Sequence, residues 1–223
     1  MKNLFVFLLL CTLATTAFSQ VSIGLSASAN QSFWKWQIKD PSINLNYEPA
    51  IGWRSAVMGE WQISPIVGVR AEFGKQVKRN KDSKLEITDN NGGFIEAEGS
   101  ENFQFWEGSL LMQISPIKKF PNTYLLAGAT YGRLTNAYGV IKGGIDLEGG
   151  NKSNFDIDIE NSFYNKNAHA TDFGLGSNIP LGKTSSLKIE GRFQYSLSNL
   201  STSDNVEASI SPLMLTVGYL HRL

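Results

Sequence analysis

Residues 187–195 read LKIEGRFQY, and apolar and polar side chains alternate along this stretch. The apolar side chains stand at odd-numbered positions, at Leu187, Ile189, Phe193 and Tyr195. The even-numbered positions between them carry Lys188, Glu190, Arg192 and Gln194. Because successive side chains of a β-strand point to opposite faces, this stretch predicts a strand with one apolar and one charged face.

The same period of two runs through most of the chain. It recurs over residues 21–30, 51–62, 67–74 and 213–220, and no convincing stripe of helical period occurs after residue 20. We therefore predict an all-β protein. Runs bounded by turn residues predict eight strands, at residues 21–36, 45–63, 66–78, 102–114, 123–140, 168–179, 187–198 and 207–223.

The connections between the predicted strands alternate in length. Short turns are expected at Ser64-Pro65, at residues 115–122 and at residues 180–186, whereas residues 79–101 and 141–167 form long segments. Short turns at one rim and long loops at the other are typical of outer-membrane barrels. The pattern predicts an eight-stranded antiparallel up-and-down transmembrane β-barrel with short periplasmic turns and long extracellular hairpin loops.

Each long segment is expected to form a hairpin above the membrane. Turn residues at 89–93 and at 149–151 stand between short alternating apolar runs. The last predicted strand contains Pro212, within a tripeptide Ile-Ser-Pro that ends two earlier strands. Because proline cannot donate to a ladder, we expect that strand to begin at Leu213 or to carry a bulge there.

The overall composition narrows the classes of function. The chain has 223 residues, with 20 Lys and Arg against 20 Asp and Glu. This balance argues against nucleic acid as a partner, because phosphate binding usually leaves a basic surplus. A mean hydropathy of -0.16 argues against a helical membrane protein but not against a barrel, whose alternating faces cancel in the average.

The first 19 residues are interpreted as a signal peptide. Lys2 supplies the positive end, residues 4–13 form a short apolar core, and small residues precede a cleavage site before Gln20. The only cysteine, Cys11, lies in this segment, so the barrel domain at residues 20–223 contains none. Export without disulfides fits a Gram-negative envelope protein, and we expect the cell outer membrane as its location.

The distribution of charge predicts which face of the strands is inside. A soluble lipocalin-like barrel needs a lysine-rich exterior, whereas most lysines here fall in loops, turns or strand ends. Mid-strand positions carry arginine and glutamate instead, and arginine suits confined ion pairs because its planar group binds carboxylates bidentately. We predict a polar network inside the barrel, with the aliphatic side chains facing lipid. The predicted network consists of Arg54, Glu60, Arg70, Glu72, Glu107, Glu190 and Arg192.

Such a network bears on transport through the barrel. Eight strands enclose an interior that side chains can fill, so we expect a plugged lumen and not a general diffusion pore. Aromatic residues near the predicted strand ends suit the interfacial girdles of a membrane barrel. These aromatic residues are Trp34, Trp36, Trp61, Trp106, Tyr124 and Tyr219.

Four short motifs link the chain to a known family. They are YLLAG at residues 124–128, DFGLG at 172–176, EGRFQYSLSN at 190–199 and VGY at 217–219. With these motifs the chain resembles the small outer-membrane β-barrel family of Bacteroidetes that includes the PorT-type proteins. That family typically has glycine where Ser196 stands. The resemblance implies a barrel fold and an outer-membrane location, and some members of the family are tied to protein secretion.

Three other patterns suggest a catalytic or ligand-binding site. His169 and Asp172 are two members of a possible hydrolase triad, but alternation puts them on opposite faces of one strand. The sequence Gly182-Lys183-Thr184 is similar to a phosphate loop, yet a strand follows it where phosphate binding uses a helix, so we expect a turn. Asp156–Glu160 places three carboxylates on one strand face, which fits either a bound cation or a solvated acidic surface.

The sequence therefore predicts a non-enzymatic outer-membrane barrel, without cofactor or metal, in a structural, adhesion or secretion-associated role. The expected partners are outer-membrane lipid and lipopolysaccharide, the barrel-insertion machinery, and an envelope protein that contacts the loops at 79–101 and 141–167. Two alternatives stay open. One is a soluble periplasmic lipocalin-like barrel that binds an apolar ligand, which requires the aliphatic rows to point inward; the other is an outer-membrane lipid-modifying enzyme.

Overall fold

A computed structural model describes residues 21–38, 43–88, 94–115, 122–142, 152–156 and 164–223. The predicted signal peptide lies outside these residues. Among the described residues, no helix is long and apolar enough to cross a membrane. The strands of this part of the chain are β1 (Val21–Ile38), β2 (Ile43–Pro49), β3 (Ile51–Gln62), β4 (Val67–Thr88), β5 (Phe94–Ile114), β6 (Thr123–Lys142), β7 (Lys152–Asp156), β8 (Asn167–Pro180), β9 (Ser185–Ser196) and β10 (Val206–Arg222).

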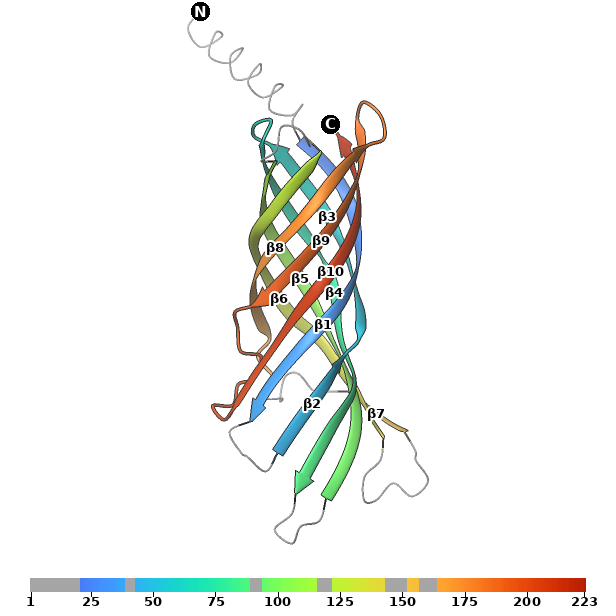
Figure 1. Cartoon of the computed structure of the whole chain (residues 1–223), viewed down its shortest axis with the longest axis vertical. Coiled ribbons are helices and arrows are strands. Elements are labelled where there is room, and N and C mark those ends of the chain that lie inside the picture. Colours follow the sequence, from blue (N-terminus) through green and yellow to red (C-terminus); the bar gives the residue numbers. More distant parts are fainter. Residues whose placement is uncertain (1–20, 39–42, 89–93, 116–121, 143–151, 157–163) are drawn as a thin grey trace, which may run out of the picture.

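Eight of these strands close into a barrel (Figure 1). Each pairs antiparallel with its neighbours in the order β1-β3-β4-β5-β6-β8-β9-β10, and β10 returns to β1 to complete the ring. The closing pair runs from Ser22 opposite Arg222 to Ile38 opposite Val206. The two short strands lie outside the ring, where β2 pairs with β4 and β7 pairs with β6. The predicted eight-stranded antiparallel barrel is confirmed.

The strands that lead to the long loops are longer than the sequence pattern predicts. The expected loop at 79–101 consists largely of strand, because β4 and β5 stay paired as far as Thr88 opposite Phe94. In Figure 1 this hairpin extends beyond the barrel, at the end opposite the short turns. The hairpin predicted there is thus present, and its tip at 89–93 lies outside the described residues.

The second predicted hairpin is formed by other residues than expected. β6 continues to Lys142, which stands opposite Lys152 at the start of β7. The expected ascending run at residues 145–147 lies outside the described residues. The acidic positions Asp158 and Glu160 also lie outside them, so the cation prediction for Asp156–Glu160 has no structural counterpart here.

Pro212 does not interrupt the last strand, contrary to the expectation of a late start or a bulge. β10 is continuous from Val206, and Pro212 stands opposite Ser32 of β1. On its other side, the pairing with β9 begins only at Leu213. Proline at position 212 therefore lies just outside the β9 ladder, where a missing N–H group breaks no pairing.

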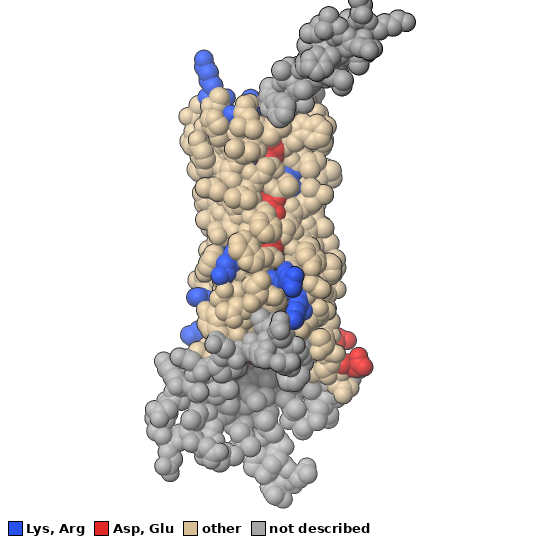
Figure 2. Space-filling view, turned by 180° about the vertical axis from the view of Figure 1, so that it is seen from behind, with Lys and Arg blue, Asp and Glu red and all other residues tan. Residues whose placement is uncertain are grey.

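The two faces of the wall differ sharply in polarity. Leu25, Leu175 and Leu215 point outward and are 64, 62 and 62% exposed, whereas Arg70 and Arg192 point inward and are each 1% exposed. The space-filling view shows a barrel wall that only small charged patches interrupt (Figure 2). The aliphatic rows therefore face outward, which contradicts the soluble lipocalin-like alternative.

The aromatic residues predicted to form girdles divide between the two faces. Trp61, Trp106 and Tyr219 are outward and about half exposed, at 48, 46 and 46%. Trp34 and Trp36 point inward instead and pack against a buried apolar cluster. Tyr124 is also inside, with only 4% exposure. The girdle prediction was wrong for these three residues, because proximity to a strand end says nothing about which face a side chain occupies.

Close approach between strands requires glycine at particular inward positions. A Cβ atom at Gly128 of β6 would lie 2.2 Å from the carbonyl oxygen of Leu110 and 2.8 Å from the Cα atom of Leu111, both in β5. At Gly191 of β9, by contrast, an added Cβ meets nothing within 4 Å. An added methyl group therefore clashes with the neighbouring strand at Gly128 and fits without a clash at Gly191.

We predict that Gly128→Ala lowers the free energy of unfolding by about 1–3 kcal/mol, because the wall has to separate to admit the methyl group. Gly191→Ala serves as the matched control and should leave stability unchanged. Urea unfolding of the refolded barrel in lipid vesicles, followed by gel migration without heating, measures both. Equal stability of the two variants would contradict the predicted packing.

Candidate functional site

The interior of the barrel holds a balanced set of charges, called the lumen network below. Five basic and five acidic side chains point inward and are almost completely buried. The basic members are Arg54, Arg70, Lys78, Lys188 and Arg192, and the acidic members are Glu60, Glu72, Glu107, Asp172 and Glu190. Because a buried charge is costly unless opposite charge and hydrogen bonds compensate it, the equal numbers allow this interior to exist.

Glu72 of β4 lies at the centre of the lumen network. Arg192 donates two parallel hydrogen bonds to its carboxylate, from Nη1 to Oε2 and from Nη2 to Oε1, each at 2.9 Å. Arg54 donates from Nη1 to Oε2 at 2.7 Å, and Arg70 from Nη1 to Oε1 at 3.2 Å. One carboxylate thus joins guanidinium groups from β3, β4 and β9, and the bidentate contact with Arg192 is among the strongest that arginine makes.

Glu190 of β9 links the same arginines to the opposite wall. Its Oε1 lies 2.5 Å from Nη1 of Arg70, and its Oε2 lies 3.0 Å from Nη2 of Arg192. The hydroxyl of Tyr124, from β6, donates to Oε1 at 2.5 Å. Strands on different sides of the ring are therefore connected across the lumen.

Glu60 organises the end of the network nearest the short turns. Its Oε2 lies 2.7 Å from Nζ of Lys188, accepts a hydrogen bond from Nε2 of Gln113 at 2.6 Å, and lies 3.3 Å from Nε of Arg70. The Lys188 ammonium also stands 4.5 Å from the ring centre of Tyr124. This lysine is therefore held by a carboxylate, an amide and an aromatic face.

Glu107 and Lys78 form the part of the network nearest the long hairpins. Lys78 Nζ lies 3.0 Å from Oε1 of Glu107, donates to Oε1 of Gln194 at 3.0 Å, and stands 4.7 Å from the ring centre of Phe105. The Oε2 atom of Glu107 is 3.8 Å from Nε of Arg54. Lys78 thus lies where the charged interior gives way to aromatic side chains.

Asp172 of β8 is held through hydroxyl groups. Thr130 donates to its Oδ2 at 2.5 Å, and the hydroxyls of Thr130 and Ser109 are 2.7 Å apart. The other carboxylate oxygen, Oδ1, is buried without a hydrogen-bond partner among the described residues. Asp172 is therefore the least satisfied acid of the lumen network.

All seven residues proposed from the sequence lie inside the ring and contact one another. Sequence reasoning missed three charged members, Lys78, Lys188 and Asp172, and the uncharged partners Gln113 and Tyr124. Alternation identifies Lys188, which shares the even-numbered row of Glu190 on β9. The same argument applies to Asp172, since the outward Phe173 is its neighbour in the chain.

An apolar cluster fills the interior above the lumen network, toward the long hairpins. Its buried members are Phe103, Phe105, Leu134, Ala137, Leu200, Ala208 and Ile210. Trp36 and Phe103 both pack edge-on against Tyr164, with ring centres 5.9 and 5.0 Å apart. Burial, and then the nearby Glu101 carboxylate, raise the pKa of the Tyr164 hydroxyl above its ordinary value. The rule that apolar side chains face lipid does not predict this cluster, because here the apolar residues face inward and outward neighbours such as Gln104, Arg133 and Ser209 are polar.

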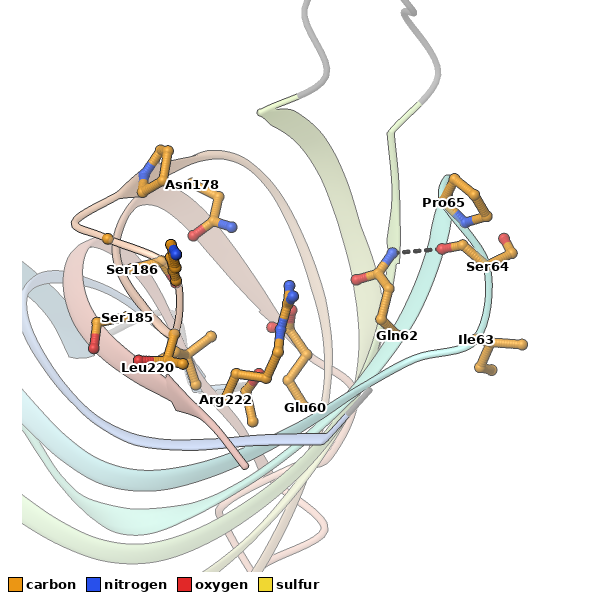
Figure 3. A pocket seen from close by; sticks show the side chains of 15 residues that line it. Glu60, Gln62, Ile63, Ser64, Pro65, Asn178, Ser185, Ser186, Leu220 and Arg222 are labelled. Carbon is orange, nitrogen blue, oxygen red and sulfur yellow. Dashed lines mark hydrogen bonds between the residues drawn. The ribbon is translucent and has the colours of Figure 1, made fainter. Parts of the chain in front are cut away.

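A polar cavity lies at the opposite end, between the short turns (Figure 3). Its volume is about 410 Å³. Arg222 extends into it, Glu60 contributes to its lining, and Gln62 donates a hydrogen bond to the carbonyl oxygen of Ser64 at 2.6 Å. Glu60, which belongs to the lumen network, is one of the lining residues, so the cavity is a vestibule at this end of the network.

The residues that suggested other chemistry are placed as follows. His169 is exposed on the outside of β8, and Asp172 is buried inside, so the two side chains are on opposite faces. Residues 181–184, which include the expected turn at Gly182-Lys183-Thr184, connect β8 to β9 without regular structure. Among the described residues, no three His, Cys, Asp or Glu side chains form a group that could hold a metal ion.

The fold and the two faces together define a class of protein. A closed antiparallel barrel with aliphatic residues outside and charges inside is an outer-membrane β-barrel protein. The outer membrane is also its location, because an apolar surface that surrounds the whole barrel is not stable in water.

Comparison with known proteins finds distant structural similarity alone. No family model matches the chain, and no curated protein matches it in sequence. Among solved structures, it is similar to the outer membrane protein OprG from Pseudomonas aeruginosa, with 8% identity, a TM-score of 0.46, and coverage of 92% of this chain and 97% of that one. The attachment invasion locus protein Ail of Yersinia pestis has 12% identity and a TM-score of 0.38, with 90 and 99% coverage. The outer membrane protease OmpT from Escherichia coli has 8% identity and a TM-score of 0.46, with 91 and 96% coverage.

Likeness at this level says nothing of a shared function, since the proteins concerned include a protease. The more specific resemblance to PorT-type proteins stays a prediction.

We predict that Glu72→Gln lowers the free energy of unfolding by about 3–5 kcal/mol, because it leaves three guanidinium groups with one fewer buried counter-charge. The double variant Glu72→Leu, Arg192→Leu removes one charge of each sign and should recover part of the loss. Urea unfolding in phosphatidylcholine vesicles, followed by tryptophan fluorescence, measures these changes.

Glu207→Gln is the control for Glu72→Gln, because Glu207 is exposed on β10 outside the lumen. It should unfold like the unaltered protein. If Glu72→Gln were as stable as this control, Glu72 would not hold the lumen network together.

Proposed function

We propose that the chain is a non-enzymatic, non-conducting outer-membrane barrel that presents a rigid β-sheet at the cell surface to an envelope partner. The observation that supports the proposal is the burial of the inward side chains: five basic and five acidic residues and, nearer the long hairpins, an apolar cluster occupy the described lumen. The function of a barrel closed in this way involves its surfaces and not transport through its lumen.

Two layers of different chemistry support a closed lumen. In the charged layer, the carboxylates of Glu72 and Glu190 are bound by arginines from different strands, so no water-filled path is needed to solvate them. In the apolar layer, Phe103 and Leu200 are 1 and 3% exposed, and an ion that passed them would lose its hydration without compensation. Each layer alone opposes ion flow.

The surface hairpins are the part of the molecule suited to a partner. β4 leaves its pairing with β3 after Val77 and continues to Thr88, which at about 3.3 Å per residue is roughly 35 Å of strand. Beyond the ring, β2, β4, β5, β6 and β7 pair in this order as a surface sheet. Among the described residues its outer strands, β2 and β7, are edges, and sheet edges are sites at which a partner strand can add. The resemblance to PorT-type proteins supports a role in secretion.

We predict that the purified barrel produces no steady ion current in a planar lipid bilayer, because its interior holds no continuous water path. A porin inserted in the same bilayer is the positive control. Stepwise current with the conductance of an open eight-stranded pore would refute the closed lumen.

Shortening the β4–β5 hairpin tests the partner role. A variant in which residues 81–98 are replaced by a two-residue Asn-Gly turn should still insert into the outer membrane and migrate faster on gels when unheated, because the ring is intact. Chemical cross-linking in whole envelopes should then recover the adducts of the unaltered protein but not those of the variant. Identical adducts for both proteins would contradict a partner at this hairpin.

A further inference from the structure

One outward-facing row interrupts the apolar wall with basic residues. On β4, β5, β6 and β8, no Lys, Arg, Asp or Glu occupies an outward position between the short turns and Phe73, Gly108, Tyr131 and His169. The next outward positions toward the long hairpins are Lys75, Trp106, Arg133 and Asn167. These four residues, one from each strand, are called the cationic row.

The register places the members of the cationic row side by side. Lys75 stands opposite Trp106, Trp106 opposite Arg133, and Arg133 opposite Asn167. Because adjacent strands are about 4.8 Å apart, the backbones at Lys75 and Arg133 are roughly 10 Å apart, with Trp106 between them. Figure 2 shows basic side chains on this wall close to its boundary with the grey atoms.

The two cations of the row lack a counter-charge from the protein. Within the described part of the chain, neither Lys75 nor Arg133 forms an ion pair or a side-chain hydrogen bond, whereas every basic residue of the lumen network is paired. Two like charges on the two strands that flank β5 repel each other, and at the edge of an apolar wall water solvates them incompletely. An anion supplied from outside the protein would remove both costs.

The uncharged members of the row complete a headgroup site. Tyr131 donates a hydrogen bond to Oδ1 of Asn167 at 2.7 Å, which fixes the amide and leaves its nitrogen free to donate outward. Trp106 is 46% exposed and stacks on Phe73, with ring centres 5.3 Å apart and planes inclined by 12°. On the side of the membrane, the row therefore borders the stacked rings of Trp106 and Phe73. On the side of the long hairpins, Lys75, Arg133 and Asn167 can donate hydrogen bonds.

We propose that the cationic row binds the phosphorylated headgroup of a glycolipid in the outer leaflet. Arg133 and Lys75 bind phosphate oxygens, the Asn167 amide donates to a sugar hydroxyl or phosphate, and Trp106 packs at the border between sugar and acyl chain. A lipid is favoured over an acidic protein because the row lies at the edge of the lipid-facing wall nearest the long hairpins, where acyl chains are already in place. The proposal rests on the membrane location and deepens the proposed function by naming the lipid that the barrel contacts.

The test uses the full-length mature barrel, refolded in phosphatidylcholine vesicles that contain lipid A with two phosphates or fully dephosphorylated lipid A. We expect the phosphorylated lipid to raise the midpoint temperature of unfolding, read from gel migration, above that in the dephosphorylated lipid. In the variant Lys75→Gln, Arg133→Gln this difference should disappear, and the apparent affinity for phosphorylated lipid A should fall at least about tenfold.

Two further variants keep the test specific. Asn167→Asp retains an oxygen acceptor for Tyr131 but adds a negative charge to the row, so it should weaken binding of the phosphorylated lipid without impairing folding. Lys183→Gln removes a cation from the turn at the other end of the barrel and should behave like the unaltered protein. The proposal is overturned if all variants bind phosphorylated lipid A equally, or if inorganic phosphate in solution gives the same stabilisation as the lipid.

If the membrane location itself is wrong, the experiment gives a different result from the one expected if only the lipid site is wrong. In that case the unaltered barrel would not associate with vesicles of either composition, and flotation of the vesicles detects this directly. A barrel that inserts into both kinds of vesicle but is equally stable with and without lipid phosphates refutes the cationic row alone. Loss of cross-linking to an acidic protein in the double variant, with unchanged lipid binding, would assign the row to a protein partner and likewise overturn the proposal.

Discussion

The hydrogen bonds of three arginines to the carboxylate of Glu72 are the interaction on which the rest of this structure depends. With aliphatic rows turned toward lipid, the charges of the lumen network point into an interior that eight strands make just wide enough for side chains. Charges in that space are stable only when they neutralise one another, and Glu72 joins the guanidinium groups of Arg54, Arg70 and Arg192 in one contact set. Removing that carboxylate would leave like charges facing one another across the barrel.

In the proposed function the interior is closed and the outside of the molecule contacts the partner. Glu60 lines the vestibule between the short turns, and the apolar cluster around Phe103 lies at the other end of the lumen network. The surfaces proposed for partners are the surface sheet that continues β4 and β5 beyond the ring, and the cationic row on the wall next to it. The strands β4, β5 and β6, which carry the row and most of the surface sheet, are also strands of the ring.

Alternation in the sequence was sufficient to predict the eight-stranded ring and placed the seven proposed network residues on inward positions. The predicted strand 45–63 was wrong at its start, because residues 45–49 belong to β2, which pairs with β4 outside the ring. Alternation was insufficient at the two ends of the molecule. Within the segment at residues 79–101 a hairpin was predicted, but with short arms beside its turn, because a strand outside the membrane needs no apolar face and so carries a weaker period. Trp34, Trp36 and Tyr124 were assigned to the lipid side, although Trp34 shares its even-numbered row with Ser32. Around Phe103 the interior itself becomes apolar, and hydrophobicity then no longer tells inside from outside.

Accessibility along β1 tests the central claim most directly, that an apolar wall in lipid encloses a closed lumen. Ala27 and Ala29 point outward and Ser28 points inward, so cysteine fits at each position, and a nitroxide label can report on its surroundings. In lipid vesicles, the labels at 27 and 29 should collide with membrane-dissolved oxygen but not with a water-soluble nickel complex, while the label at 28 should be protected from both. Collision of the nickel complex with label 28 would show an open, water-filled lumen, and its collision with labels 27 and 29 would show a wall that faces water.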